Sequence, residues 1–262
     1  METKKSWKEK LSSLSEKAAL LLMLGSGLAT AMALFARRHW LLETAVHFRL
    51  QYLVALLLAA IILLLRNRRP AALLALLLAL PNLLPLLPYY TPHAAADSSE
   101  ETYRVLMMNV LYENESFADV LDLIDKSDAD FVVLVEMSEA WDTAVLPQMR
   151  SYPHVRVAHT DWRYKTYLFS RHSFADNVET TIGSHSRPAV TAIFDLNGQS
   201  FRLVGAHPTS PSRPWRIRSR NHELQLLAED IAAASEPTML VGDLNITPFS
   251  PHFDDLMKNA GL

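Results

Sequence analysis

Three long apolar runs lie within residues 1–90, and they constrain the fold more than any other feature of the chain. They cover residues 18–36, 48–65 and 71–88, and almost no polar residue interrupts them. A helix that spans a bilayer takes about 20 such residues. The alternative, buried helices of a soluble domain, fits poorly because these runs lack a polar face. We therefore expect a membrane domain over residues 1–90 with about three spans.

Basic residues flank the apolar runs and predict their orientation. Five lysines lie between residues 4 and 17, before the first run, and three arginines lie between residues 66 and 69, after the second. Positive residues favour the cytoplasmic side, so we expect both segments there and the chain after Tyr90 on the opposite side. The arginines between residues 37 and 49 oppose this orientation. A cleaved signal peptide is a less favoured alternative for the first run, since two more runs follow it.

The charge of the chain divides near residue 100. Residues 1–100 carry 11 Lys or Arg and 6 Asp or Glu, whereas residues 101–262 carry 14 and 22, a net charge of −8. We therefore expect a linker over residues 91–101, small and acidic in composition, and a separate domain over residues 102–262. A domain of that length can bury its own core. The sequence has no cysteine, which excludes disulfides and thiolate metal sites.

Two apolar runs of the second domain end in polar residues. Residues 103–111 (YRVLMMNVL) and 130–136 (DFVVLVE) have the composition of buried strands, and Asn109 and Glu136 lie near their ends. A buried amide costs free energy unless it is hydrogen bonded, so Asn109 either caps a loop or faces a site. Between the two strands, a helix is predicted to begin at Ser116, because apolar residues follow it at helical spacing.

A histidine follows another predicted strand. Residues 167–170, 189–196 and 200–206 are strand-like, and the Asn-Gly pair at 197–198 predicts a hairpin turn between the last two. His207 comes directly after the third of these strands, and the proline that follows it restricts the backbone there. The sequence has ten histidines, and most histidines in a chain are solvated or structural. Only its position therefore sets His207 apart.

An acid and an amide stand two residues apart in the segment 238–248 (TMLVGDLNITP). The first residues of this segment read as a buried strand, and the alternation of a strand would place Asp243 and Asn245 on one face. A carboxylate beside a carboxamide can orient water and hold a phosphate or metal oxygen. A turn after the strand is an equally good interpretation, because Asp and Asn are frequent turn residues.

An arginine-rich segment follows His207. Four arginines and a tryptophan lie close together there: Arg213, Trp215, Arg216, Arg218 and Arg220. Their side chains suit contact with phosphate and stacking on a base, which makes Arg213 and Arg220 candidates for substrate binding. A solvated loop and helix start is the simpler explanation, and we favour it for the segment as a whole. Helices are predicted over the apolar stripes at 224–231 and 253–260.

Taken together, these segments resemble the endonuclease/exonuclease/phosphatase superfamily, which has the deoxyribonuclease-I-like fold. The resemblance covers residues 103–262 and is closest to bacterial members with N-terminal membrane helices. It is carried by the segments RVLMMNV, VVLVEMSEAW, LFSRHSF, GAHPTSPSRP, RSRNHELQLLA and VGDLNITPFSPHF. It implies an α/β fold, a two-sheet α/β/β/α sandwich with its site at one edge, preceded here by about three transmembrane helices.

The resemblance also implies roles for the polar residues at the predicted strand ends. Glu136 would be the main Mg²⁺ ligand, with Asn109 near both the metal and the phosphate; Mn²⁺ is an alternative ion. Asp243 would orient or deprotonate the attacking water, and Asn245 would hold a phosphate oxygen. His207 would donate a hydrogen bond to the phosphoryl group. Hard oxygen ligands suit Mg²⁺, and phosphoryl transfer depends mostly on positioning and charge neutralisation.

These observations predict a membrane-anchored, Mg²⁺-dependent phosphoesterase, foremost a nuclease-like phosphodiester hydrolase. We expect a multi-pass protein of the bacterial inner (cytoplasmic) membrane with its site outside the cytoplasm. Its predicted partners are the lipid bilayer and a phosphoester substrate, either nucleic acid or a phospholipid headgroup, and no protein partner is predicted. The net charge of −8 argues against tight, non-specific binding to duplex nucleic acid. The alternative is a catalytically silent domain that binds a phosphorylated ligand or partner.

One part of the family pattern has no counterpart in residues 103–262. That pattern closes with a further strand that bears an Asp-His pair, preceded by another Asp. We therefore expect the sandwich to be C-terminally incomplete, with an unpaired sheet edge.

Overall fold

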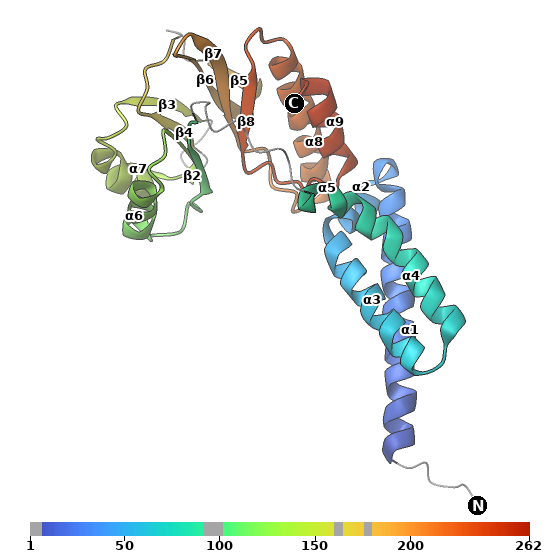
Figure 1. Cartoon of the computed structure of the whole chain (residues 1–262). Helices are drawn as coiled ribbons and strands as arrows, with labels where there is room; N and C mark the ends of the chain where they lie inside the picture. The colour runs from blue at the N-terminus through green and yellow to red at the C-terminus, as the bar shows by residue number, and fades with distance from the viewer. Residues whose placement is uncertain (1–6, 92–101, 160–164, 176–179) are drawn as a thin grey trace, which may run out of the picture. The chain divides into compact units, whose positions relative to one another are not determined.

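The computed structural model describes residues 7–91, 102–159, 165–175 and 180–262 (Figure 1). The chain forms two compact units, and each is described by itself. One comprises Met1–Ala95 with Thr247–Pro251, and the other comprises Ala96–Ile246 with His252–Leu262. The predicted linker lies outside the described residues except for Thr91.

The first unit is helical. Its α-helices are α1 (Trp7–Leu34), α2 (Trp40–Thr44), α3 (Arg49–Leu65), α4 (Arg69–Leu83) and α5 (Leu87–Tyr90). Short 3-10 helices lie between them at Ala36–Arg38, Ala45–Phe48 and Leu84–Leu86. Three stretches are long and apolar enough to cross a membrane: Ser13–Leu34, Trp40–Leu65 and Arg69–Tyr90. They overlap the three apolar runs of the sequence.

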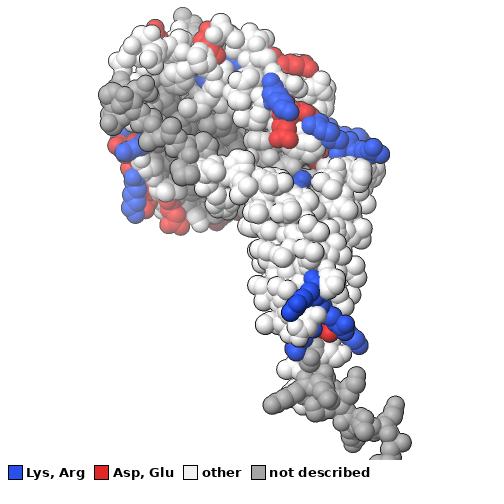
Figure 2. Space-filling model, turned by 45° about the vertical axis from the view of Figure 1, so that its right-hand side comes forward, with Lys and Arg blue, Asp and Glu red and all other residues white. Residues whose placement is uncertain are grey.

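Small residues and a few large ones lie between these helices, and many large apolar residues face outward. Alanines of α1, α3 and α4 are buried together with Leu56 and Leu63, whereas other leucines of the same helices are exposed, Leu65 to 76%. Asn82 of α4 is fully buried, and its Nδ2 donates a hydrogen bond of 2.8 Å to Thr30 Oγ1 of α1. Figure 2 shows a broad uncharged band along this unit, with Lys and Arg side chains at its lower end. Small residues at the helix interfaces, polar contacts between helices and leucines that face outward are features of helices packed in lipid.

The second unit is a sandwich of two four-stranded sheets. Sheet A has the order β1-β2-β4-β3, formed by β1 (Val105–Asn109), β2 (Phe131–Met137), β4 (Lys165–Ser170) and β3 (His154–Ala158). Sheet B has the order β5-β6-β7-β8, formed by β5 (Thr180–Ser184), β6 (Arg187–Leu196), β7 (Gln199–Ala206) and β8 (Thr238–Gly242). The two-sheet α/β sandwich predicted from the sequence is confirmed.

Helices cover the outer face of each sheet, so the unit has four layers (Figure 1). The helices α6 (Phe117–Ser127) and α7 (Glu139–Val145), with a 3-10 turn at Leu146–Gln148, pack on sheet A. The helices α8 (Pro214–Ala232) and α9 (Pro251–Ala260) pack on sheet B. Successive residues of β2 point alternately toward α6 and toward sheet B, which explains why its sequence is apolar without interruption.

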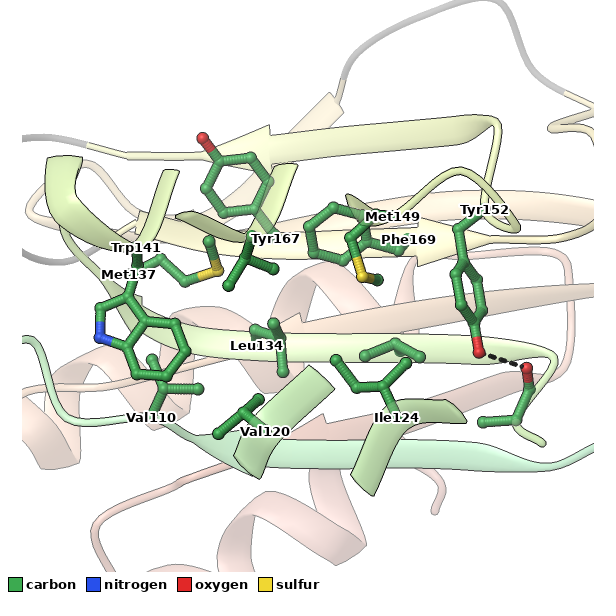
Figure 3. Packing of buried hydrophobic residues seen from close by; sticks show 13 residues of the cluster. Val110, Val120, Ile124, Leu134, Met137, Trp141, Met149, Tyr152, Tyr167 and Phe169 are labelled. Carbon is green, nitrogen blue, oxygen red and sulfur yellow. Dashed lines mark hydrogen bonds between the residues drawn. The ribbon is translucent and has the colours of Figure 1, made fainter. Parts of the chain in front are cut away.

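The core between sheet A and its helices surrounds Trp141 (Figure 3). Trp141 is fully buried, and its ring meets that of Phe117 edge-on, with 4.8 Å between centroids. Its Nε1 donates to the carbonyl of Leu111 at 3.3 Å. The hydroxyl of Tyr152 donates to the carbonyl of Ala129 at 2.9 Å. These two bonds attach the loop after β1 and the residues before β2 to the core.

Each sheet contributes one parallel pair of strands, β1 with β2 and β7 with β8. A helix makes the crossover in each pair, α6 in the first and α8 in the second, as parallel strands require. The carboxyl ends of the two strands in a parallel pair lie at the same edge of the sheet. The fold therefore places the residues at the carboxyl ends of these four strands at neighbouring edges of the two sheets.

Candidate active site

Four polar residues occupy the carboxyl ends of the parallel strands. Asn109 ends β1, Glu136 is the last residue but one of β2, His207 follows β7 and Asp243 follows β8. Asn109 of sheet A contacts Asp243, which follows a strand of sheet B, and Glu136 of sheet A contacts His207 in the same way. The structure therefore brings together four of the residues that the sequence singled out.

The side chain of Asn109 bridges the two carboxylates. Its Nδ2 donates hydrogen bonds of 2.9 Å to Glu136 Oε1 and of 2.9 Å to Asp243 Oδ2. Its Oδ1 accepts a hydrogen bond of 3.0 Å from the backbone N–H of Leu111, which fixes the orientation of the carboxamide. Asn109 thus faces a site, and at the same time it organises the loop after β1.

Glu136 lies in an irregular part of its strand. The pairing of β2 with β4 shifts in register between Leu134 and Met137, as in a β-bulge, and Glu136 has φ of +62°. A positive φ is uncommon for a residue with a side chain like that of glutamate. Bulges redirect a side chain relative to the strand, and strained backbone clusters at functional sites. The bulge turns Glu136 toward Asn109.

Asp243 and Asn245 lie in a loop and not on a strand, so the predicted strand alternation is wrong at this point. The strand β8 ends at Gly242, whose φ is +151°. A Cβ at this position would lie 1.9 Å from the carbonyl oxygen of Ala206, so only glycine fits. Asp243 Oδ1 then accepts a hydrogen bond of 3.1 Å from the backbone N–H of Asn245, the pattern of an Asx turn. The turn interpretation of this segment is the correct one.

Asn245 connects the two loops of sheet B. Its Nδ2 donates a hydrogen bond of 2.9 Å to the carbonyl of Pro208, in the loop that begins at His207. Its backbone has φ of +52°, in the left-handed region that asparagine tolerates better than most residues. The carboxamide expected to hold a phosphate oxygen therefore already donates one hydrogen bond within the protein, to the carbonyl of Pro208.

His207 is buried beside Glu136. The residue is 6% exposed, and its Nε2 lies 3.3 Å from Glu136 Oε1. Neither ring nitrogen has a hydrogen-bond partner within the described part of the chain. Burial lowers the pKa of His207 below its ordinary value of 6.5, while Glu136 and then Asp243 oppose part of that shift. A lowered pKa favours the neutral imidazole, which has one N–H to donate.

The two candidate arginines have different environments. Arg213 is exposed at the N-cap of α8, with Trp215 beside it exposed to 55%. Arg220, in contrast, is 1% exposed, and its guanidinium donates to the backbone carbonyl of Asn245 at 2.7 Å. The structure thus places Arg220 behind the loop that carries Asp243.

A buried glutamate that the sequence analysis does not single out lies next to this group. Glu223 of α8 is 4% exposed and accepts hydrogen bonds from Thr209, two residues after His207. One signal in the sequence could have found it. The stripe of apolar residues on α8, continued by one turn toward the N-terminus, includes Glu223 and Arg220 among positions that face the sheet.

Comparison with known proteins agrees with this geometry. A sequence model described as the Endonuclease/Exonuclease/phosphatase family matches residues 108–262, more than half of the chain. The chain belongs to the endonuclease/exonuclease/phosphatase family. Members of this family are hydrolases, among them nucleases and phosphatases. No curated protein sequence matches the chain.

Several solved structures are similar to this member of the family. The human Nocturnin catalytic domain with a bound sulfate anion is 15% identical, with a TM-score of 0.51 over 60% of this chain and 70% of that chain. Humanized D. rerio TDP2 is 17% identical, with a TM-score of 0.49 over 61% and 70%. A beta toxin mutant from Staphylococcus aureus is 16% identical, with a TM-score of 0.49 over 62% and 73%. At these identities the similarity to Nocturnin supports the fold alone.

The donor atoms at the strand ends suit Mg²⁺, the ion expected for this family. Glu136 and Asp243 accept from the same Asn109 nitrogen, so their accepting oxygens lie no farther apart than the sum of the two 2.9 Å bonds. Two carboxylates this close repel one another, and a cation relieves the repulsion. Mg²⁺ takes one or two carboxylates with water and phosphate oxygens. No group of three or more His, Cys, Asp or Glu suited to a metal occurs among the residues that the structure describes.

Proposed function

We propose that this chain is a membrane-anchored, Mg²⁺-dependent phosphodiesterase, related in mechanism to the nucleases of its family, with its site outside the cytoplasm. One observation carries the proposal. Two carboxylates, Glu136 and Asp243, share the amide nitrogen of Asn109, and the buried His207 lies 3.3 Å from the first of them. An acid pair beside an imidazole is a suitable arrangement for phosphoester hydrolysis.

Each side chain has a distinct role in this proposal. Glu136 would hold the metal ion with Asn109 beside it, and the ion when bound supplies positive charge to offset the charge on the phosphoryl oxygens. Asp243, held by Asn109 and by the N–H of Asn245, would orient a water molecule and take its proton as the water oxygen attacks phosphorus. The ester oxygen leaves on the opposite side. His207 would donate an N–H to a phosphoryl oxygen, since neither ring nitrogen has a hydrogen-bond partner among the described residues.

The substrate is proposed to be a phosphodiester near the membrane surface, in nucleic acid or in a phospholipid headgroup. Residues 101–262 have a net charge of −8, so a broad electrostatic attraction to polyanions is not the basis of binding. Local cations would serve a single phosphate instead. The exposed Arg213 is the candidate for that contact, and Trp215 beside it offers a ring for stacking.

The proposed anchor is the first unit, with the N-terminus in the cytoplasm of a bacterial cell. The arginines near residue 66 follow the second stretch capable of crossing the membrane, and four of the five N-terminal lysines precede the first. With three spans, the residues after Tyr90 would then lie outside. This orientation supports an extracytoplasmic site.

The test of the proposed activity compares two chromogenic substrates. The purified full chain, in detergent, is given bis(p-nitrophenyl) phosphate and p-nitrophenyl phosphate, each with Mg²⁺, with Mn²⁺ and with EDTA. We expect turnover of the diester with Mg²⁺, weaker turnover of the monoester and none with EDTA. Activity that persists in EDTA would refute the metal dependence, and activity on the monoester alone would refute the diesterase assignment.

A second candidate function is a domain that binds a phosphorylated ligand without hydrolysing it. The observation that favours it is that Asn109 Nδ2 already bridges Glu136 Oε1 and Asp243 Oδ2 within the protein. This candidate predicts saturable binding of phosphate esters, measured by calorimetry, in a chain that shows no turnover with any divalent ion.

A further inference from the structure

Two oppositely charged residues are buried on the side of α8 that faces sheet B. Arg220 is 1% exposed and Glu223 is 4% exposed, and they lie three residues apart, on neighbouring positions of the helix surface. All the other buried residues of this helix are apolar: Ile217, Leu224, Leu227, Ala228 and Ile231. Buried charges are unfavourable unless they are hydrogen bonded, so the partners of this pair indicate what it does.

Glu223 holds the loop that follows β7. The backbone N–H of Thr209 donates to Glu223 Oε2 at 2.7 Å, and the Thr209 hydroxyl donates to Oε1 at 2.8 Å. The Ser186 hydroxyl, from the turn between β5 and β6, donates to the same Oε1 at 3.3 Å. Thr209 is itself 6% exposed. A single carboxylate therefore fixes the backbone and the side chain of a residue two positions after His207.

Arg220 holds the loop that follows β8. Its Nη1 donates to the backbone carbonyl of Asn245 at 2.7 Å, and its Nε donates to the side-chain oxygen of Asn221 at 2.7 Å. Asn245 has the left-handed backbone described above, so the bond from Arg220 stabilises a conformation that the chain would not favour by itself. The preceding residues of this loop include Asp243.

The two loops are also joined to each other. Asn245 Nδ2 donates to the carbonyl of Pro208, between His207 and Thr209. Hydrogen bonds thus join Glu223 to the first loop, that loop to Asn245, and Asn245 to Arg220, and the helix backbone joins Arg220 to Glu223. Two residues of one helix, three positions apart in the sequence, therefore contact both loops that carry the site residues of sheet B.

We propose that Arg220 and Glu223 are positioning residues, which hold His207 and Asp243 at the spacing that hydrolysis requires. The proposal rests on the proposed function, and it assigns Arg220 a role behind the site in place of contact with substrate. Buried hydrogen bonds to backbone groups hold loops more firmly than exposed ones, because the interior excludes competing water. Loss of either side chain should therefore loosen the loops before it affects binding of substrate.

The first test measures hydrogen–deuterium exchange in the full chain in detergent, without substrate or metal. Arg220→Met and Glu223→Gln approximately keep the size of each side chain, and Arg202→Met is the matched control. Arg202 is also buried, at 9% exposed, but it bonds Thr238 and the carbonyl of Asp230 instead of either site loop. We expect exchange in peptides covering 207–211 and 243–246 to rise about tenfold in the two test variants and to stay unchanged there in the control. Unchanged exchange in both loops of folded test variants would overturn the proposal.

The second test measures steady-state hydrolysis of the diester by the same proteins. We expect kcat to fall by about tenfold or more in Arg220→Met and Glu223→Gln, with KM changed less than about threefold, because misplacement of catalytic groups acts mainly on the chemical step. Arg220→Lys, which keeps one donor, should recover part of kcat. Faster loop exchange with an unchanged kcat would overturn the positioning role. A wild-type chain without turnover would refute the proposed function instead, and the exchange result would still decide whether the two residues hold the loops.

Discussion

The carboxylates of Glu136 and Asp243 share one hydrogen-bond donor, the side-chain nitrogen of Asn109, at 2.9 Å from each. The two acids come from different sheets of the sandwich. The amide that joins them is uncharged, so it does not cancel their negative charges. A bound cation would do so, and it would thereby reduce the repulsion between the two acids.

Removal of the bridging amide should destabilise the chain in a metal-dependent way. We expect Asn109→Ala to lower the free energy of unfolding by about 1–3 kcal/mol in EDTA, because two acceptors lose their donor. Added Mg²⁺ should restore most of this loss. Urea titration followed by tryptophan fluorescence measures it, and Trp141 is the tryptophan buried in the core of sheet A among the five of the sequence. The control is Asn259→Ala, an exposed position on α9, which should change stability by less than about 0.5 kcal/mol; an equal effect of Mg²⁺ on both variants would contradict the prediction.

The backbone at Gly242 should tolerate no side chain. We expect Gly242→Ala to cost more than about 4 kcal/mol or to prevent folding, because the added Cβ would lie 1.9 Å from the carbonyl oxygen of Ala206. Gly198→Ala is the matched control. Gly198 also has a positive φ, of +78°, but no atom within 4 Å of the added Cβ, so the cost there should be about 1–2 kcal/mol. Thermal unfolding of both variants tests the difference, and similar midpoints would show that close packing at Gly242 is unimportant.

Alkaline pH should weaken the core between sheet A and its helices. Burial raises the pKa of Tyr152 above its ordinary value of 10, against the opposing effect of Arg171, and burial with the nearby Asp142 raises that of Tyr167. Because both pKa values are higher in the folded chain than in the unfolded chain, the protonated phenols contribute stability that is complete below about pH 10 and is lost as the pH rises further.

Urea unfolding at a series of pH values from about 8 to about 11 measures this effect. Tyr152→Phe should lose about 1 kcal/mol at neutral pH, since the hydroxyl bonds the carbonyl of Ala129. It should also lose less stability than the wild type on going to high pH. A double variant, Tyr152→Phe with Tyr167→Phe, that keeps the full wild-type slope would contradict the assignment.

The proposed orientation can be tested by cysteine labelling, because the chain has no cysteine of its own. Gln199→Cys lies at an exposed position of the second unit, and Asn67→Cys lies in the exposed turn between α3 and α4. In intact cells, a membrane-impermeant maleimide should label the first variant and not the second until the membrane is permeabilised. The reverse pattern would place the site in the cytoplasm.

The sequence predicts those parts of the fold in which apolar pattern and burial agree. The strand β2 is buried on both faces, so its residues read as an uninterrupted apolar run, and Glu136 stands out where the run ends. The Asn197-Gly198 turn is equally legible, because both residues adopt the positive φ that a tight hairpin needs. For the same reason, Asn109 and His207 could be recognised as residues at strand ends.

Other elements escape the pattern because tertiary contacts form them. The strand β3 contains Arg156, which is 5% exposed, donates to the carbonyl of Thr191 and stacks on the ring of Phe174. A buried arginine breaks the alternation that identifies a strand, and only the opposite sheet explains it. The strand β5 and the helix α7 are also unforeseen. Both are short, and they depend on pairing with β6 and on packing around Trp141.

The loop after β8 shows the same limit at the site itself. The residue types Asp243 and Asn245 are legible in the sequence, but their arrangement depends on the backbone at Gly242 and on the buried bond from Arg220. A charged residue in an arginine-rich segment normally reads as solvated. Its burial follows from the position of α8 on sheet B, which the sequence does not specify by pattern alone.

The most direct test of the central claim, that Glu136 and Asp243 form a metal-dependent hydrolytic site, is the kcat/KM of site variants for a phosphodiester with Mg²⁺. Glu136→Gln and Asp243→Asn keep shape and remove one charge each, and Asp195→Asn, at an exposed position on β6, is the control. The account predicts that each site variant loses at least about a hundredfold in kcat/KM while the control keeps wild-type activity. Wild-type activity in either site variant would contradict it.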